Sequence, residues 1–169
     1  MKKSIFFIIF ITTLFTFQSC GFYSFTGASV APNIKTFQVN FFRNNAPIVE
    51  PGIDRLFTQR LQDIIVNQTN LDLTNQGGDL IYEGEITEYY VAPITATAQN
   101  TAAQNRLTIT VNVRFYDTKN EGNDLEQRFS FYYDYAGSAQ LVGSQRDDAV
   151  NIIFERITQD VFNATLARW

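Results

Sequence analysis

The stretch "NRLTITVNVRFYD", residues 105–117, decides what kind of fold the chain can adopt. Apolar and polar side chains alternate through it, and successive side chains of a β-strand point to opposite faces of a sheet. The alternation therefore predicts a half-buried strand over residues 106–116. Its apolar side consists of Leu107, Ile109, Val111, Val113 and Phe115, and its polar side consists of Thr108, Thr110, Asn112, Arg114 and Tyr116.

Two neighbouring segments, residues 79–91 and 127–135, are also rich in β-branched and aromatic residues. The turn-forming stretch "DTKNEGN", residues 117–123, joins the central strand to the last one. The three strands together predict an antiparallel meander with one wet face. On the last strand, the apolar side is Phe129, Phe131, Tyr133 and Tyr135, and the polar side is Arg128, Ser130, Tyr132 and Asp134.

The N-terminal half predicts a strand, a helix and a short strand. Residues 35–41 alternate and end at a loop over residues 43–47, while Pro51 suits the first turn of a helix. A short apolar piece follows at residues 71–73, and this order of elements predicts a parallel crossover. The strand places Phe37, Val39 and Phe41 on one face, and the helix carries the apolar stripe Ile53, Leu56, Phe57, Leu61, Ile64 and Ile65.

A second helix is predicted to begin near Ser144 and to run through about Leu166, because Ser144 and Asp147 have the spacing of a capping box. Its apolar stripe is Val150, Ile153, Phe154, Ile157 and Val161. The predicted fold class is α+β: a two-layer sandwich in which two helices pack on one face of a mixed, mostly antiparallel sheet of about four strands.

The N-terminus predicts a lipoprotein signal. A positive start precedes an apolar run over residues 5–17 that is too short for the roughly 20 residues that span a bilayer. In "FQSC", Ser19 is followed by Cys20, the arrangement at which a bacterial lipoprotein is cut and acylated, although Phe17 and Gln18 depart from the ideal motif. An ordinary secreted protein with a free cysteine is the alternative. The expected division is a signal peptide over 1–19, a lipidated tether over 20–33 and a single α+β domain over 34–169.

Lipidation of Cys20 would attach the protein to a membrane through acyl chains, without a transmembrane helix. Gly21 is not the aspartate that retains lipoproteins at the inner membrane of some bacteria. We therefore expect the protein on the periplasmic side of the outer membrane.

The composition excludes several classes of chemistry. The chain has no histidine and one cysteine, which rules out Ser-His-Asp and Cys-His catalysis and zinc sites built on these residues. No cofactor or metal is expected. The net charge of −4 becomes more negative once Lys2 and Lys3 are removed, which argues against nucleic acid as a partner. Glu83 and Glu85, with Glu88 nearby, could form a glycosidase-like carboxylate pair, although such spacing is common on solvated strands.

The order of elements resembles the LptE family of lipopolysaccharide-assembly lipoproteins. The resemblance is carried by the start "CGFYSFTG", the helix "GIDRLFTQRLQDII", the strands "DLIYEGEITEYYV" and "NRLTITVNVRFYD" and the final helix "AVNIIFERITQDVFNATL". It implies a non-enzymatic protein that sits inside a large β-barrel partner, LptD, supports its assembly and helps insert lipopolysaccharide into the outer leaflet. The polar sheet face would suit the barrel's polar lumen.

Two sets of site residues follow from this resemblance. The expected partner-binding residues are Thr108, Thr110, Asn112, Arg114, Tyr116, Arg128 and Tyr132, since Tyr and Arg are good interface anchors. Some family members are thought to contact lipopolysaccharide phosphates through basic residues near the long loop. Here the loop over residues 92–105 has no charge, so it can be a flexible tip or a segment that inserts among other chains. Arg106, Arg114 and Arg128 are the nearest candidates for lipopolysaccharide binding.

Other classes stay open at this point. The segment from Lys35 to Ile65, followed by "DLIYEGEI", also resembles envelope lipoproteins of the CsgG and synthase-activator kind. Self-assembly into a ring would favour the first, and binding to a cell-wall synthase the second. A periplasmic glycan-cleaving enzyme that uses Glu83 or Glu85 is a further alternative, and it predicts that Glu-to-Gln changes abolish turnover.

Overall fold

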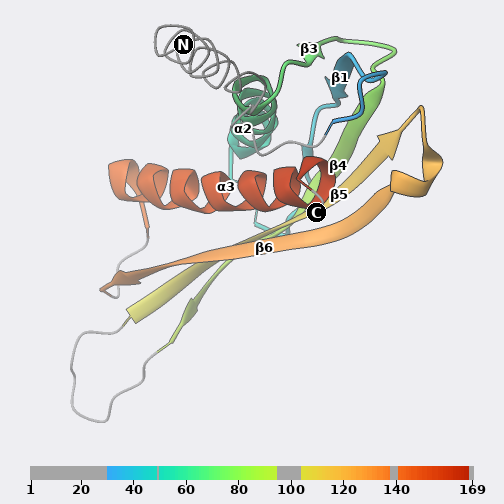
Figure 1. Ribbon diagram of the computed structural model, residues 1–169. Coiled ribbons are helices and arrows are strands. Elements are labelled where there is room, and N and C mark those ends of the chain that lie inside the picture. Colours follow the sequence, from blue (N-terminus) through green and yellow to red (C-terminus); the bar gives the residue numbers. More distant parts are fainter. Residues whose placement is uncertain (1–29, 49, 95–103, 138–140, 168–169) are drawn as a thin grey trace, which may run out of the picture.

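A computed structural model describes residues 30–48, 50–94, 104–137 and 141–167 (Figure 1). The predicted signal peptide, Cys20, most of the predicted tether and residues 95–103 of the long loop lie outside the described residues. The elements, in chain order, are β1 (Thr36–Val39), β2 (Arg43–Asn44), α2 (Ile53–Gln68), β3 (Asp72–Leu73), β4 (Leu80–Pro93), β5 (Gln104–Asp117), the 3-10 turn η2 (Glu121–Asn123), β6 (Leu125–Ala136) and α3 (Gly143–Leu166).

The strands form one mixed six-stranded sheet. Five of them lie in the order β3-β1-β4-β5-β6, and β2 pairs with β4 beyond the end of β1. Strand β1 runs parallel to both β3 and β4, whereas β4, β5 and β6 form an antiparallel meander. The predicted α+β class, the meander and the parallel pairing around the first helix are confirmed. The sheet has six strands instead of about four. Two of them, β2 and β3, are only two residues long, and β3 falls on the short strand predicted at residues 71–73.

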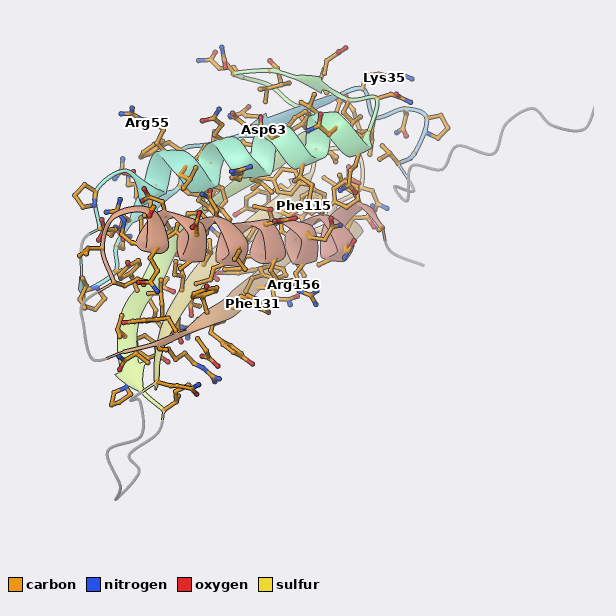
Figure 2. The ribbon with its side chains drawn as sticks, turned by 90° about the vertical axis from the view of Figure 1, so that its left-hand side faces the viewer. Lys35, Arg55, Asp63, Phe115, Phe131 and Arg156 are labelled. Carbon is orange, nitrogen blue, oxygen red and sulfur yellow. The ribbon has the colours of Figure 1, made fainter. Side chains whose placement is uncertain are left out.

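Both helices pack on the same face of the sheet. Helix α3 contacts β5 and β6, α2 contacts β1, β2 and β3, and the helices contact each other (Figure 1). Two polar bonds join them, from Arg60 to Asn151 at 3.0 Å and from Gln68 to Gln159 at 3.1 Å. Arg55 and Asp63 project from the outer side of α2, away from the sheet (Figure 2). The predicted two-layer arrangement is therefore confirmed.

The buried apolar residues form one cluster between the sheet and the helices. Phe57 of α2 lies at its centre, with its ring 5.0 Å from that of Phe42 and 5.2 Å from that of Phe154, both edge-to-face. Tyr82 is fully buried, and its hydroxyl lies 3.0 Å from that of Thr165. Most of the predicted apolar stripes face this cluster, including every residue predicted for the second helix.

The predicted position of Phe41 on the same strand face as Phe37 and Val39 is wrong. Strand β1 ends at Val39, and Phe42 turns inward instead, while 54% of Phe41 is exposed. The chain leaves the ladder here because the Phe42 N–H donates to the Thr58 hydroxyl of α2 at 3.1 Å. It rejoins β4 as β2, at residues that we expected to be a loop.

The predicted capping box at Ser144 is also wrong. Helix α3 begins at Gly143, so that Ser144 lies inside it, and the N-cap residue Val142 makes no side-chain cap bond. Asp147 instead accepts hydrogen bonds from Arg146. Neither helix in the described part of the chain is both long enough and apolar enough to cross a membrane.

Candidate protein-interaction face

The sheet face opposite the helices consists mostly of polar side chains from β4, β5 and β6, and we call it the open face. Cross-strand register places these side chains in rows, because β5 pairs with β4 on one side and β6 on the other. The open face comprises Ile81, Glu83, Glu85, Glu88 and Tyr90 of β4, Arg106, Thr108, Thr110, Asn112, Arg114 and Tyr116 of β5, and Glu126, Arg128, Ser130, Tyr132 and Asp134 of β6.

Arg114 holds two carboxylates at one end of the open face. Its guanidinium donates to Glu85 through two nitrogens, at 3.2 and 3.1 Å, and its Nε lies 3.2 Å from Glu83. Asn112 donates to Glu85 as well, at 3.1 Å. These bonds, first from Arg114 and then from Asn112, lower the pKa of Glu85 below its ordinary value. Glu85 is therefore firmly ionised at neutral pH.

Similar pairs continue along the face. The Thr110 hydroxyl donates to Glu88 at 2.7 Å, and Arg128 donates to the other oxygen of Glu88 at 2.7 Å. The Thr110 bond and then the Arg128 bond lower the pKa of Glu88. Arg106 forms a two-pronged pair with Asp134, at 2.7 and 2.8 Å, and this pair lowers the pKa of Asp134. Each of the three arginines of the open face is therefore paired with a carboxylate on another strand, and the pair between Arg128 of β6 and Glu88 of β4 reaches across β5.

Two tyrosines lie at the end of the open face towards the long loop. In register, Thr108 lies between Tyr90 of β4 and Tyr132 of β6. Tyr90 is 46% exposed and Tyr132 is 45% exposed. The Arg106 guanidinium lies 3.6 Å from the centre of the Tyr132 ring, which fixes the ring by a cation–π contact. An exposed aromatic ring that is already held in place is the kind of side chain that anchors a protein interface.

The structure brings all seven expected partner-binding residues onto this one face. They differ in access, because Thr110 is buried under its neighbours while Tyr116, Arg128 and Tyr132 are exposed. The three arginines expected to bind lipopolysaccharide lie here too, each already paired with a carboxylate. A phosphate would have to compete with these carboxylates. Both sets of residues stay predictions.

Tyr90 was missed from the sequence because of a β-bulge. The register between β4 and β5 shifts between Ile86 and Glu88, so that Thr87 is an extra residue in β4. Before the bulge the even-numbered residues of β4 face the core, and beyond it they face the opposite side. Tyr89 therefore lies in the core and Tyr90 lies on the open face. A strict alternation over residues 79–91 cannot show this. The only signal is the pair of adjacent tyrosines, one of which must face each way.

The open face shows no metal-binding arrangement. Among the described residues there is no group of three or more His, Cys, Asp or Glu side chains placed to hold an ion. Every buried side-chain nitrogen and oxygen in the described ranges has a hydrogen-bond partner. The buried polar side-chain atoms of the open face are therefore all hydrogen-bonded.

The fold and the open face together define the class of this molecule: an α+β protein with two helices on one side of a sheet and a long polar surface on the other. Residues 34–165 match the profile of the LptE family, whose description is lipopolysaccharide assembly. The match spans well over half of the chain, and the chain belongs to the LptE family.

Solved structures with a similar arrangement include three bacterial proteins. A minor lipoprotein from Acinetobacter baumannii is 15% identical, with 76% of this chain and 89% of that chain covered and a TM-score of 0.46. Rare lipoprotein B from Shewanella oneidensis is 12% identical, with 75% and 89% covered and a TM-score of 0.44. A PelC dodecamer from Paraburkholderia phytofirmans is 9% identical, with 83% and 94% covered and a TM-score of 0.44. No curated protein matches the chain.

Proposed function

We propose that this protein is an outer-membrane lipoprotein that binds inside a large LptD-like β-barrel, helps the barrel to assemble and assists the insertion of lipopolysaccharide into the outer leaflet. Membership of the LptE family supports the role in lipopolysaccharide assembly. The open face is the observation that carries the barrel partnership. It is long, polar and uncovered, and the lumen of a wide barrel is also polar.

The internal charge pairing of the open face favours a protein partner. Each of Arg106, Arg114 and Arg128 is already paired with a carboxylate on another strand of the sheet. A partner can therefore cover these three arginines without leaving any of them as an unpaired buried charge, which would be costly. Tyr90 and Tyr132 supply aromatic anchors at one end of it.

The carboxylates of the open face fit a structural role better than a catalytic role. A glycosidase needs one carboxylic acid whose pKa is raised, so that it carries a proton at neutral pH. Arg114 and Asn112 have the opposite effect on Glu85, since their hydrogen bonds lower its pKa. The proposed role is therefore binding without turnover.

The proposed attachment completes this role. Residues 1–19 would be removed as a signal peptide, Cys20 would be acylated, and residues 20–33 would tether the domain over 34–169 to the periplasmic side of the outer membrane. In this proposal, Cys20→Ala leaves the chain in the soluble fraction of lysed cells, whereas the native chain sediments with outer membranes. Sedimentation of the alanine variant with membranes would contradict lipid anchoring.

The test of the barrel partnership is co-purification. The tagged, lipidated chain is extracted from outer membranes in a mild detergent, and the proteins that co-elute are identified and quantified by mass spectrometry. We expect one large β-barrel at close to one copy per chain. A cell-wall synthase in its place, or only a ring of this chain, would overturn the proposal.

A matched pair of variants connects the result to the open face. Changing Tyr90 and Tyr132 together to Ala should lower the recovered barrel by about tenfold, which corresponds to about 1.4 kcal/mol. Changing Val66 and Ile152 to Ala is the control, because these exposed side chains lie on the two helices. Equal losses in both variants would mean that the open face is not the binding surface.

A further inference from the structure

A pocket of about 320 Å³ lies where the open face meets the β1–β2 segment. This volume is near the lower end of the range for small-molecule sites in proteins. The pocket is lined by Asn40, Phe41, Arg43 and Asn45 from the β1–β2 segment, Glu83, Gly84 and Glu85 of β4, and Arg114 of β5.

The pocket exists because the sheet is interrupted. Between β1 and β2 the chain leaves β4, and Phe42 turns to the helix side, where its ring is fully buried. A Cβ atom at Gly84 would lie 2.7 Å from the Phe42 ring, so Gly84 provides the space that the ring needs. Phe41 remains on the outside beside the pocket, 54% exposed.

Part of the pocket wall is fixed by hydrogen bonds. Arg114 holds Glu83 and Glu85, and Asn40 donates to Glu83 at 3.3 Å. Two other side chains are available, because Arg43 and Asn45 form no side-chain hydrogen bond or ion pair within the part of the chain that the structure describes. The pocket therefore combines a rigid floor with unpaired donors at its edge.

The charges of the lining select the kind of ligand. An anion would be attracted by Arg43 and Arg114 but repelled by Glu83 and Glu85, and the reverse holds for a cation, so the two charges of each sign favour neither. An uncharged ligand with many hydroxyl groups meets neither repulsion. A hydroxyl can donate to a carboxylate and accept from a guanidinium or an amide, so it can use all of these groups at once. The face of an aromatic ring carries negative charge density, which attracts the C–H groups of a sugar.

We propose that this pocket binds one uncharged sugar ring. The sugar packs its C–H face on Phe41 and places its hydroxyl groups on Arg43, Asn45 and Glu85. Sugar binding by the pocket does not depend on the proposed function, but the identity of the natural ligand does. If the proposed function is correct, the natural ligand is the carbohydrate of lipopolysaccharide. A glycan of the cell wall offers the same chemistry from another source.

The test is a binding titration with the mature, lipidated chain, followed by saturation-transfer NMR. The detergent must have a polyoxyethylene head group, because a maltoside would compete for the pocket. Three probes are compared: the dephosphorylated core oligosaccharide released from the host's lipopolysaccharide, chitotriose as an uncharged cell-wall-like sugar, and inorganic phosphate. Phe41→Ala and Arg43→Ala remove the two pocket contacts, and Phe41→Tyr keeps the aromatic ring. Ile48→Ala and Arg55→Ala are the controls, because both side chains are exposed and lie outside the pocket lining.

We expect the core oligosaccharide to bind, with affinity at least tenfold lower in Phe41→Ala and Arg43→Ala and unchanged in Phe41→Tyr and both controls. Binding of chitotriose with the same dependence would support the sugar pocket and assign it to a wall glycan. Binding of phosphate alone, or sugar binding that is insensitive to Phe41 and Arg43, would overturn the proposal, as would no binding at all. The titration uses the isolated chain. Its result can therefore be interpreted even if the co-purification experiment recovers no barrel.

Discussion

Gly84 is a single residue on which both faces of the sheet depend. A Cβ atom there would lie 2.0 Å from the Asn112 carbonyl oxygen and 2.7 Å from the Phe42 ring. We expect Gly84→Ala to lower the free energy of unfolding by about 3 kcal/mol, because backbone and a buried ring would both have to move. Urea unfolding measures this change.

The matched control for this prediction is Gly122→Ala. A Cβ atom at Gly122 would meet only the Asn120 side-chain oxygen at 3.2 Å, in the exposed turn η2. Its expected cost is below about 1 kcal/mol. Equal unfolding midpoints for the two variants would show that Gly84 is not constrained by its neighbours.

The ion pair and hydrogen bonds of Asp79 should make the folding stability of the protein depend on pH. Its carboxylate pairs with Lys119 at 2.9 Å and accepts from the backbone N–H groups of Lys35 and Thr36 at 2.8 and 3.1 Å. These bonds, with that of Lys119 first, hold the pKa of Asp79 far below its ordinary value. A lowered folded-state pKa stabilises the protein above the unfolded pKa of about 4, and this contribution is lost as pH falls towards the folded value.

Asp79→Asn should therefore be less stable than the native protein at pH 7, and the difference should shrink from about pH 5 downwards. Thermal unfolding of both proteins between pH 7 and pH 3 measures this. A difference that stays constant over the range would mean that the Asp79 charge is not responsible. Asp63→Asn serves as a control, because Asp63 is exposed and projects outward from α2 (Figure 2).

At the residue scale, the sequence predicts the residues of the open face on β5 and β6 but fails where the backbone departs from regular pairing. Phe41 and Phe42 are chemically identical, and only the Thr58 bond and the space over Gly84 decide which one is buried. Tyr90 depends on the bulge at Thr87 in the same way. These choices are made by contacts between distant segments, which a local pattern does not contain.

At the element scale, the long strands and both helices follow from apolar periodicity, because each buries one continuous face. The strand β2 does not, since two residues carry no period. It forms only because the parallel ladder of β1 on β4 resumes after the three-residue interruption. The bounds of α3 agree with the prediction to within one residue, but its cap does not, since the N-cap residue Val142 makes no side-chain bond.

The aromatic contacts of Phe57 connect α2 to the β1–β2 segment and to α3. Its ring packs edge-to-face on Phe42 of the β1–β2 segment and on Phe154 of α3. We expect Phe57→Ala to destabilise the protein by about 3–5 kcal/mol, from lost burial and a residual cavity. Val66→Ala on the same helix should change stability by less than about 0.5 kcal/mol, because Val66 is exposed. Similar losses from both changes, measured by chemical denaturation, would contradict this arrangement of the core.

At the scale of the whole molecule, the two faces of the sheet have different roles. One side is covered by α2 and α3 and contains the apolar core, while the other presents the open face with its cross-strand charge pairs. The sequence predicts this division from the alternation of apolar and polar residues, which assigns each side chain to one face. It does not predict the pairing of Arg106, Arg114 and Arg128, which depends on the register between strands.

The most direct test of the open face as the partner surface is site-specific photo-crosslinking in cells. A photoreactive residue is placed at Tyr90 or Tyr132 on the open face, and at Val66 or Ile152 on the helices as controls. We expect an adduct with one large β-barrel from both tyrosine positions, and little or none from the helix positions. An adduct only from the helix positions, or none with a barrel from Tyr90 and Tyr132, would contradict the open face as the surface that binds the partner.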